Sequence, residues 1–303
     1  MRTKSGLLIA IITAASLALS GCTTQKVTLE PATANFLAGK FVKAADGTYL
    51  EGFTPGKPDV GFTLEAIAQL SQSGDDIDVS EAEEWALSNT ESITDDSGNL
   101  ILGLAAKWLF VSEVLEFENK DARESVLSEL TSHWSEGSSA EKSGNTFDYA
   151  WQALALQAAG KPAEAKRAAE ALSQIRRVDN GWGTDLSDST TASSTDATAI
   201  ALMAFITTGL TDAAAVAKAW LKANIKADHF EAWGDVDVNG TAYAAMALQA
   251  AGEDVAPIKA WLASRVAKDG GLETPWSAGA GDVFATAQGY LPLIGLNYVE
   301  LSK

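Results

Sequence analysis

The chain has 303 residues and a formal net charge of −18 at pH 7. A surface with this much negative charge repels nucleic acids and anionic lipid headgroups, so the composition excludes both as binding partners. Cys22 is the one cysteine in the sequence, which leaves no disulfide within the chain, so the fold depends on its apolar core.

The first 21 residues have the features of a bacterial lipoprotein signal peptide. Arg2 and Lys4 precede an apolar stretch at 6–19 that is too short to span a bilayer comfortably. The following Leu-Ser-Gly-Cys, ending at Cys22, resembles a lipobox, although an ordinary signal peptide remains the alternative. The expected organisation is a cleaved signal at 1–21, a lipidated tether at 22–30 and one domain at 31–303. The lipid anchor places that domain on the extracytoplasmic face of the cell membrane.

The rest of the chain repeats one helical pattern six times. A phase-marking residue, mostly small or polar, recurs every 40 to 50 residues or so, at Thr63, Gly103, Tyr149, Thr198, Thr241 and Thr286. In most copies a small residue follows three positions later, and a large apolar residue follows seven positions later. These spacings place the residues on one face of a helix, and the small residues allow neighbouring helices to approach closely.

A second set of helices alternates with the first. It is predicted at 31–42, 80–89, 121–133, 161–174, 211–225 and 255–267, and several members carry a bulky apolar pair opposite a charged face. Such amphipathic helices cover a core, whereas the nearly uncharged first set must lie inside it. The sequence therefore predicts an all-α protein of six helix pairs, arranged as an open solenoid or a closed ring.

A family resemblance favours the closed ring. The segment QIRRVDNGWG at 174–183 resembles the Gln-x-x-Asp-Gly-x-Trp repeat of the prenyltransferase and squalene cyclase superfamily, and KDGGL and AWGDVDVNGTA are weaker copies. The resemblance covers about residues 31–302 and implies an α6/α6 toroid, with an inner barrel of six helices and a jacket of six more. In its expected extracellular location and in the catalytic groups that it lacks, the chain is most similar to the branch of intrinsic factor and transcobalamin, which binds cobalamin.

Such a toroid suggests where a ligand binds. Turns leading into the inner helices surround one mouth of the barrel, where helix N-termini present free N–H groups. Carboxylates, amides and aromatic rings there would form a binding site. The predicted ligand-binding residues are Asp59, Thr63, Asp148, Tyr149, Trp182, Asp196, Trp233, Asn239, Tyr243 and Gln288. Helix capping alone is the alternative for many of them, because Asp, Asn and Thr are preferred caps.

Motifs for catalysis by this superfamily are incomplete. Zinc-dependent prenyl transfer needs Asp, Cys and His ligands, but Cys22 lies in the lipobox, and His133 and His229 have no zinc-ligand pattern around them. The cyclase acid motif Asp-x-Asp-Asp is matched only in part by DVDV at 235–238, which leaves Asp237 as a weak catalytic candidate. We therefore expect no metal and no cofactor.

These observations predict a surface lipoprotein that binds a bulky amphiphilic small molecule in the toroid cavity and delivers it to a membrane transporter. A corrinoid such as cobalamin is the first candidate for this ligand. Two alternatives remain. One is a diverged terpene cyclase or an enzyme acting on envelope lipid or glycan, which requires Asp237 or Asp196 in the cavity with a raised pKa. The other is a structural or adhesion module that binds an envelope protein, which requires a cavity filled by side chains such as Tyr149, Trp151 and Tyr243.

Overall fold

The computed structural model describes residues 29–73, 77–136, 145–185 and 192–303. Its inner helices are α2 (Val60–Leu70), α4 (Leu102–Val114), α6 (Thr146–Ala158), α8 (Thr195–Thr208), α10 (Val238–Ala250) and α12 (Val283–Ile294). Its outer helices are α1 (Leu29–Ala38), α3 (Ser80–Ser88), α5 (Lys120–His133), α7 (Pro162–Gln174), α9 (Thr211–Asn224) and α11 (Ala256–Ser264). The predicted all-α fold of six helix pairs is confirmed.

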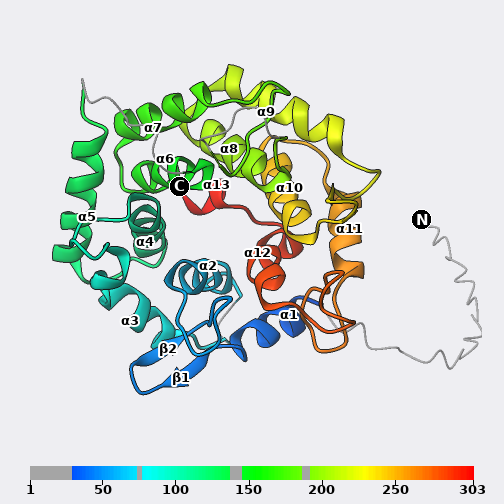
Figure 1. Cartoon of the computed structure of the whole chain (residues 1–303), viewed down its shortest axis with the longest axis horizontal. Helices are drawn as coiled ribbons and strands as arrows, with labels where there is room; N and C mark the ends of the chain where they lie inside the picture. The colour runs from blue at the N-terminus through cyan, green and yellow to red at the C-terminus, as the bar shows by residue number, and fades with distance from the viewer. Residues whose placement is uncertain (1–28, 74–76, 137–144, 186–191) are drawn as a thin grey trace, which may run out of the picture.

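The inner helices close into a ring (Figure 1). Each one contacts the next along the chain, and α12 returns to contact α2. Each outer helix packs between two neighbouring inner helices, as α9 does between α8 and α10. One outer helix separates each inner helix from the next, so all six inner helices run in the same direction and begin at one mouth of the barrel.

Burial follows the predicted division between inner and outer helices. Inner helix α8 is buried on every side from Ala197 to Phe205, which explains why it carries so little charge there. Outer helix α7 buries only one stripe, made of Ala165, Ala168, Ala169 and Leu172. Spacings of three, four and seven residues put these side chains on a single helical face.

Small residues at the phase positions allow close contact between inner helices. At Gly103, a Cβ atom would lie 1.9 Å from Oδ1 of Asp148. This contact is far too short for any residue with a side chain. Helices α4 and α6 therefore approach each other at a point where any larger residue on α4 would push them apart.

A recurring threonine attaches four of the loops at the mouth to the helices that follow them. Thr63, Thr198, Thr241 and Thr286 each accept a backbone N–H from the incoming loop through Oγ1, at 2.8–3.0 Å; the donors are Leu50, Trp182, Phe230 and Leu272. In three of these repeats an aspartate caps the same helix, namely Asp59, Asp237 and Asp282. The sequence repeat thus encodes a loop attachment as well as a helix face.

The remaining elements are short. Two antiparallel hairpins, β1 (Val42–Ala44) with β2 (Gly47–Tyr49) and β3 (Glu231–Ala232) with β4 (Asp235–Val236), lie in loops. A 3₁₀ helix, η1 (Thr90–Ile93), precedes α4, and α13 (Tyr298–Leu301) follows α12. Among the described residues, no helix has the length and apolar character needed to cross a membrane. Cys22 and the predicted signal peptide lie outside the described residues.

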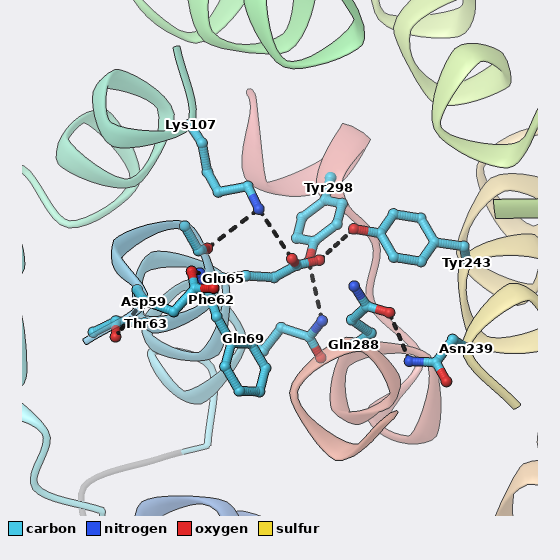
Figure 2. A network of polar contacts seen from close by, with 11 residues as sticks. Asp59, Phe62, Thr63, Glu65, Gln69, Lys107, Asn239, Tyr243, Gln288 and Tyr298 are labelled. Atoms are coloured by element: carbon cyan, nitrogen blue, oxygen red, sulfur yellow. Dashed lines mark hydrogen bonds and ion pairs between the residues drawn. The ribbon is translucent and has the colours of Figure 1, made fainter. Parts of the chain in front are cut away.

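Helix α13 folds back against α6, α8 and α10 and fills the barrel interior (Figure 1). There Tyr298, which is fully buried, joins a group that we call the axial cluster: Glu65, Gln69, Lys107, Tyr243 and Tyr298 (Figure 2). The hydroxyls of Tyr243 and Tyr298 both donate to Oε1 of Glu65, and Nζ of Lys107 lies 3.0 Å from Oε2. The cluster satisfies a buried carboxylate and excludes solvent from the barrel axis.

Candidate functional site

A cavity of about 970 Å³ opens at the mouth where the inner helices begin. We call it the mouth cavity. It lies over the starts of α8, α10 and α12, and its volume is near the upper end of the range of roughly 300–1,000 Å³ for small-molecule sites. Its carboxylates are Asp179, Asp196, Glu231, Asp237 and Asp282, and its aromatic residues are Phe53, Trp220, Phe230, Trp233, Trp276 and Phe284.

Asp237 is the most perturbed carboxyl group of the mouth cavity. It is the N-cap of α10, and its Oδ1 accepts the backbone N–H of Gly240 at 2.8 Å. Burial raises the pKa of Asp237 to about 6, and the negative charge of Asp196 adds to this rise, while the bond from Gly240 opposes it. The enzyme hypothesis requires a carboxyl group of this kind at this location.

Two more predicted residues line the mouth cavity near Asp237. Asp196 lies in the first turn of α8, and Asn239 lies in the first turn of α10. Nδ2 of Asn239 donates to Oε1 of Gln288 at 2.8 Å, which fixes the orientation of the Asn239 side chain (Figure 2). Gln288 is predicted to contact ligand, but it lies behind Asn239 and does not line the cavity.

Trp233 projects from the tip of the β3–β4 hairpin at the rim of the mouth cavity. The loop consists of two residues, Trp233 and Gly234, with φ of 54° and 87°, as a type I′ turn requires. A left-handed conformation is unfavourable for a large side chain and costs roughly 1–2 kcal/mol. Trp233 is nevertheless fully exposed to solvent, so its ring gains nothing from packing that would offset this strain. Strain held at such a position is typical of a binding residue.

Further aromatic residues continue the rim. Trp276 is 79% exposed and Phe53 is 91% exposed, whereas Phe284 is partly covered. The rings of Phe53 and Phe284 lie 5.7 Å apart, centroid to centroid. Isolated exposed aromatic residues are unremarkable, but several around one cavity mark a surface that binds something flat and partly apolar.

Two hydroxyl groups in the cavity wall have no hydrogen-bond partner among the described residues. They are Oγ of Ser194 and Oγ1 of Thr274, and the Thr274 residue is only 6% exposed. An unpaired buried hydroxyl costs about 1–3 kcal/mol relative to a paired one. Both oxygen atoms are buried within the wall and are not exposed to the cavity, so they are not contacts for a ligand in this structure.

Three predicted contact residues stabilise helix starts and loops outside the mouth cavity. Asp59 caps α2 by accepting the N–H of Phe62 at 2.8 Å, and it lines a smaller neighbouring cavity of about 410 Å³. Thr63 is fully buried and attaches the loop before α2. Asp148 forms a reciprocal capping box with Asn145 at the start of α6, and burial raises its pKa. Capping, the alternative considered for such residues, describes the contacts of Asp59 and Asp148.

Three predicted aromatic residues are buried in the core instead of facing the mouth cavity. Trp182 is 1% exposed, and its indole N–H donates to the carbonyl of Leu172 at 2.9 Å. Tyr149 packs edge-on against Trp134, and Tyr243 belongs to the axial cluster. Trp151 and Tyr243 thus pack against Tyr298 inside the barrel, as the structural-module hypothesis requires, whereas Tyr149 packs against the outer layer and the mouth is open.

Sequence reasoning missed part of the site. Phe53, Trp220 and Phe284 line the mouth cavity, but they come from a turn-rich loop, an outer helix and the start of α12. No local pattern distinguishes them from core residues. Among the described residues, no group of His, Cys, Asp and Glu is arranged to hold a metal ion.

Comparisons with known proteins identify the fold. No family model and no curated protein matches the sequence. An unsaturated glucuronyl hydrolase from Bacillus sp. GL1, described as responsible for the degradation of glycosaminoglycan, is similar in structure at a TM-score of 0.56 and 13% identity, over 88% of this chain and 95% of that one. A glycosidase variant in complex with glucose is similar at a TM-score of 0.58 and 15% identity, over 90% and 97%. Both are α/α toroids.

These neighbours correct two predictions. The toroid inferred from the prenyltransferase-like repeat is right as a fold, but the similar solved structures named above are glycosidases. The main functional prediction, a cobalamin-binding protein for delivery to a transporter, is contradicted by the same finding. It rested on missing catalytic motifs, and a motif of one enzyme family does not detect the carboxyl groups of another. The alternative of a glycan-modifying enzyme agrees better with these neighbours.

Proposed function

We propose that the protein is a glycoside hydrolase that cuts a glycan in the mouth cavity. The observation that carries the proposal is Asp237, a partly buried carboxyl group whose pKa is raised to about 6 beside the carboxylate of Asp196. Most glycosidases use two carboxyl groups that flank the scissile bond. The general acid of the pair needs a pKa close to the working pH, and the pKa of Asp237 meets that need.

In the proposed reaction, Asp237 donates its proton to the glycosidic oxygen as the bond from that oxygen to the anomeric carbon breaks. A water molecule adds to the anomeric carbon, and Asp196 accepts the proton that this water loses. Asn239, held by Gln288 at 2.8 Å, is placed to bind a sugar hydroxyl. The aromatic rim supplies flat apolar surfaces for sugar faces.

The proposal is tested by incubating the purified protein with a panel of polysaccharides, including those of its host's envelope, and measuring newly formed reducing ends. We expect wild-type activity to fall as the pH rises through about 6, because the proton on Asp237 is then lost. Asp237→Asn should lower kcat by roughly 10²–10⁴-fold, the usual contribution of a general acid.

Asp212→Asn, at an exposed position in the first turn of outer helix α9, is the matched control and should retain full activity. If the wild type releases no sugar from any polysaccharide of the panel, or if Asp237→Asn hydrolyses as fast as the control, the proposal fails.

The lipid anchor at Cys22 and the extracytoplasmic location remain proposals from the sequence. An anchored hydrolase would act on envelope glycans close to the membrane, and a neighbouring membrane protein could take up its products. Incorporation of labelled palmitate in the host should be seen for the wild type and lost in Cys22→Ser. Equal labelling of both proteins would contradict the anchor.

A further inference from the structure

The mouth cavity continues into two further cavities. On one side it shares Asp179, Trp220 and Asn224 with a cavity of about 550 Å³ that runs over outer helix α9. On the other side it shares Phe53, Asp282 and Phe284 with the cavity of about 410 Å³ beside Asp59. Helix α8 lies across the ring from α2 (Figure 1), so the three cavities form one groove across the mouth. This groove continues on both sides of the mouth cavity, whereas a pocket for one terminal sugar would be closed on one side.

The α9 end of this groove holds a fixed aromatic surface. Trp220 donates a hydrogen bond to the carboxylate of Asp179. Burial acts to raise the pKa of Asp179, but this bond, together with those from Ser193 and Gly181, outweighs burial and lowers it. The indole ring also packs against Gly181, where a Cβ atom would lie 2.8 Å from Cε2 of Trp220. Both contacts hold the ring in one orientation on the groove wall.

The opposite end holds the neighbouring rings of Phe53 and Phe284, and Trp233 and Trp276 line the central cavity between the two ends. Asp237 lies in the central cavity, with aromatic surfaces on either side of it. A glycan chain in this groove would therefore have sugar units on both sides of the bond next to Asp237.

The charge of the groove restricts which glycan chains can bind in it. Of the described residues that line the mouth cavity, five are carboxylic acids, and Lys226 is the one lysine or arginine. Such a wall repels a glycan that carries a carboxylate on each unit. The acidic wall therefore favours a chain of neutral sugars.

From the continuous groove, its aromatic surfaces and its acidic wall, we infer that the substrate is a neutral glycan chain of several units that crosses the mouth and is cut internally. This inference rests on the proposed hydrolase function. It adds the substrate class and the position of the cut.

The test uses a partial acid hydrolysate of the host's envelope polysaccharides, separated by anion exchange into neutral and acidic fractions. Asp237→Asn protein is incubated with each fraction, and native mass spectrometry gives the sizes of the retained oligosaccharides. We expect the neutral fraction to bind, with retention rising up to about five or six units. Trp220→Ala should weaken binding of the long oligosaccharides roughly tenfold, since one ring surface is lost.

Phe117→Ala, which removes a partly buried aromatic ring from the turn after α4, at the end of the barrel opposite the mouth, is the matched control and should bind like its parent. Preferential retention of the acidic fraction, retention independent of length, or no retention at all overturns the inference. Wild-type digestion distinguishes the two proposals. Release of single sugars alone refutes the internal cut while leaving the hydrolase function intact, whereas the absence of any release refutes the hydrolase function itself.

Discussion

The barrel axis and the mouth above it both place a carboxyl group among aromatic rings, but the two carboxyl groups differ in how completely they are paired. In the axial cluster, Glu65 is 3% exposed and has a partner for each oxygen, from Lys107 and from two tyrosine hydroxyls. In the mouth cavity, burial is only partial, and Asp237 has one backbone donor and a second carboxylate nearby. A fully paired buried charge stabilises one structure, whereas a poorly paired one is available for proton transfer.

The largest expected effect on stability is at the axis. Glu65→Ala removes the counter-ion of Lys107 and the acceptor of two buried hydroxyls, so the free energy of unfolding should fall by about 3–5 kcal/mol. Asp196→Ala in the mouth should change it by less than about 1 kcal/mol. Urea denaturation of both variants measures the difference, and similar losses would mean that the two regions do not differ as described.

A smaller effect on stability, with the opposite sign, is expected when Asp237 in the mouth is replaced by asparagine. The folded-state pKa of Asp237, about 6, lies above the ordinary value of about 3.9, so the folded protein binds this proton more tightly than the unfolded chain does. The stability it contributes is fully present below about pH 4 and is lost as the pH rises through 6. Asn also caps helices, so Asp237→Asn should be more stable than the wild type by up to about 2–3 kcal/mol at pH 7 and no more stable at pH 4.

Urea denaturation between pH 4 and pH 7 checks this prediction. Asp282→Asn, the same exchange at the N-cap of α12, reports the effect of altering a cap. A stability gain for Asp237→Asn that does not depend on pH would show that the carboxyl group is not desolvated.

The smallest expected effects concern Trp233, where two variants separate its contribution to ligand affinity from the cost of its backbone strain. Trp233→Ala and Trp233→Gly both remove the ring, and both should lower affinity for the neutral oligosaccharide fraction roughly tenfold. Glycine adopts the left-handed conformation without strain, so Trp233→Gly should be about 1 kcal/mol more stable than Trp233→Ala. Calorimetric titration and thermal unfolding measure the two effects, and unequal affinities of the two variants would contradict the separation.

The helices could be predicted from the sequence because each one leaves a local periodic pattern. The predicted outer helices at 80–89 and 211–225, for example, correspond to α3 (Ser80–Ser88) and α9 (Thr211–Asn224). The toroid followed from counting six pairs and from the repeat resemblance. Closure of the ring by contact between α12 and α2 joins parts of the chain more than 200 residues apart, and no local pattern records it.

The site could be predicted only in part. Asp196 and Asn239, expected from helix-start positions, and Trp233, expected from a loop, line the mouth cavity. Asp237, which also lines it, was indicated only by the partial Asp-x-Asp-Asp match. The same reasoning placed Trp182 and Tyr243 there, although the turn of each segment directs their side chains into the core. The bond from Tyr243 to Glu65 spans 178 residues of sequence, and the raised pKa of Asp237 depends on burial by separate elements. Neither is visible in a linear motif.

The threonine attachments have a consequence for how such proteins can change. Because Thr241 accepts the backbone N–H of Phe230 at the base of the β3–β4 hairpin, the segment between these residues is anchored to the first turn of its own helix, α10. Thr63, Thr198 and Thr286 anchor their loops in the same way. The loop before α8 is also bonded to Thr146 at the start of α6, so the hairpin segment is the better candidate for exchange. A library that varies residues 231–236 between fixed Phe230 and Thr241 would alter ligand preference on an unchanged barrel, which makes this toroid a scaffold for engineered recognition.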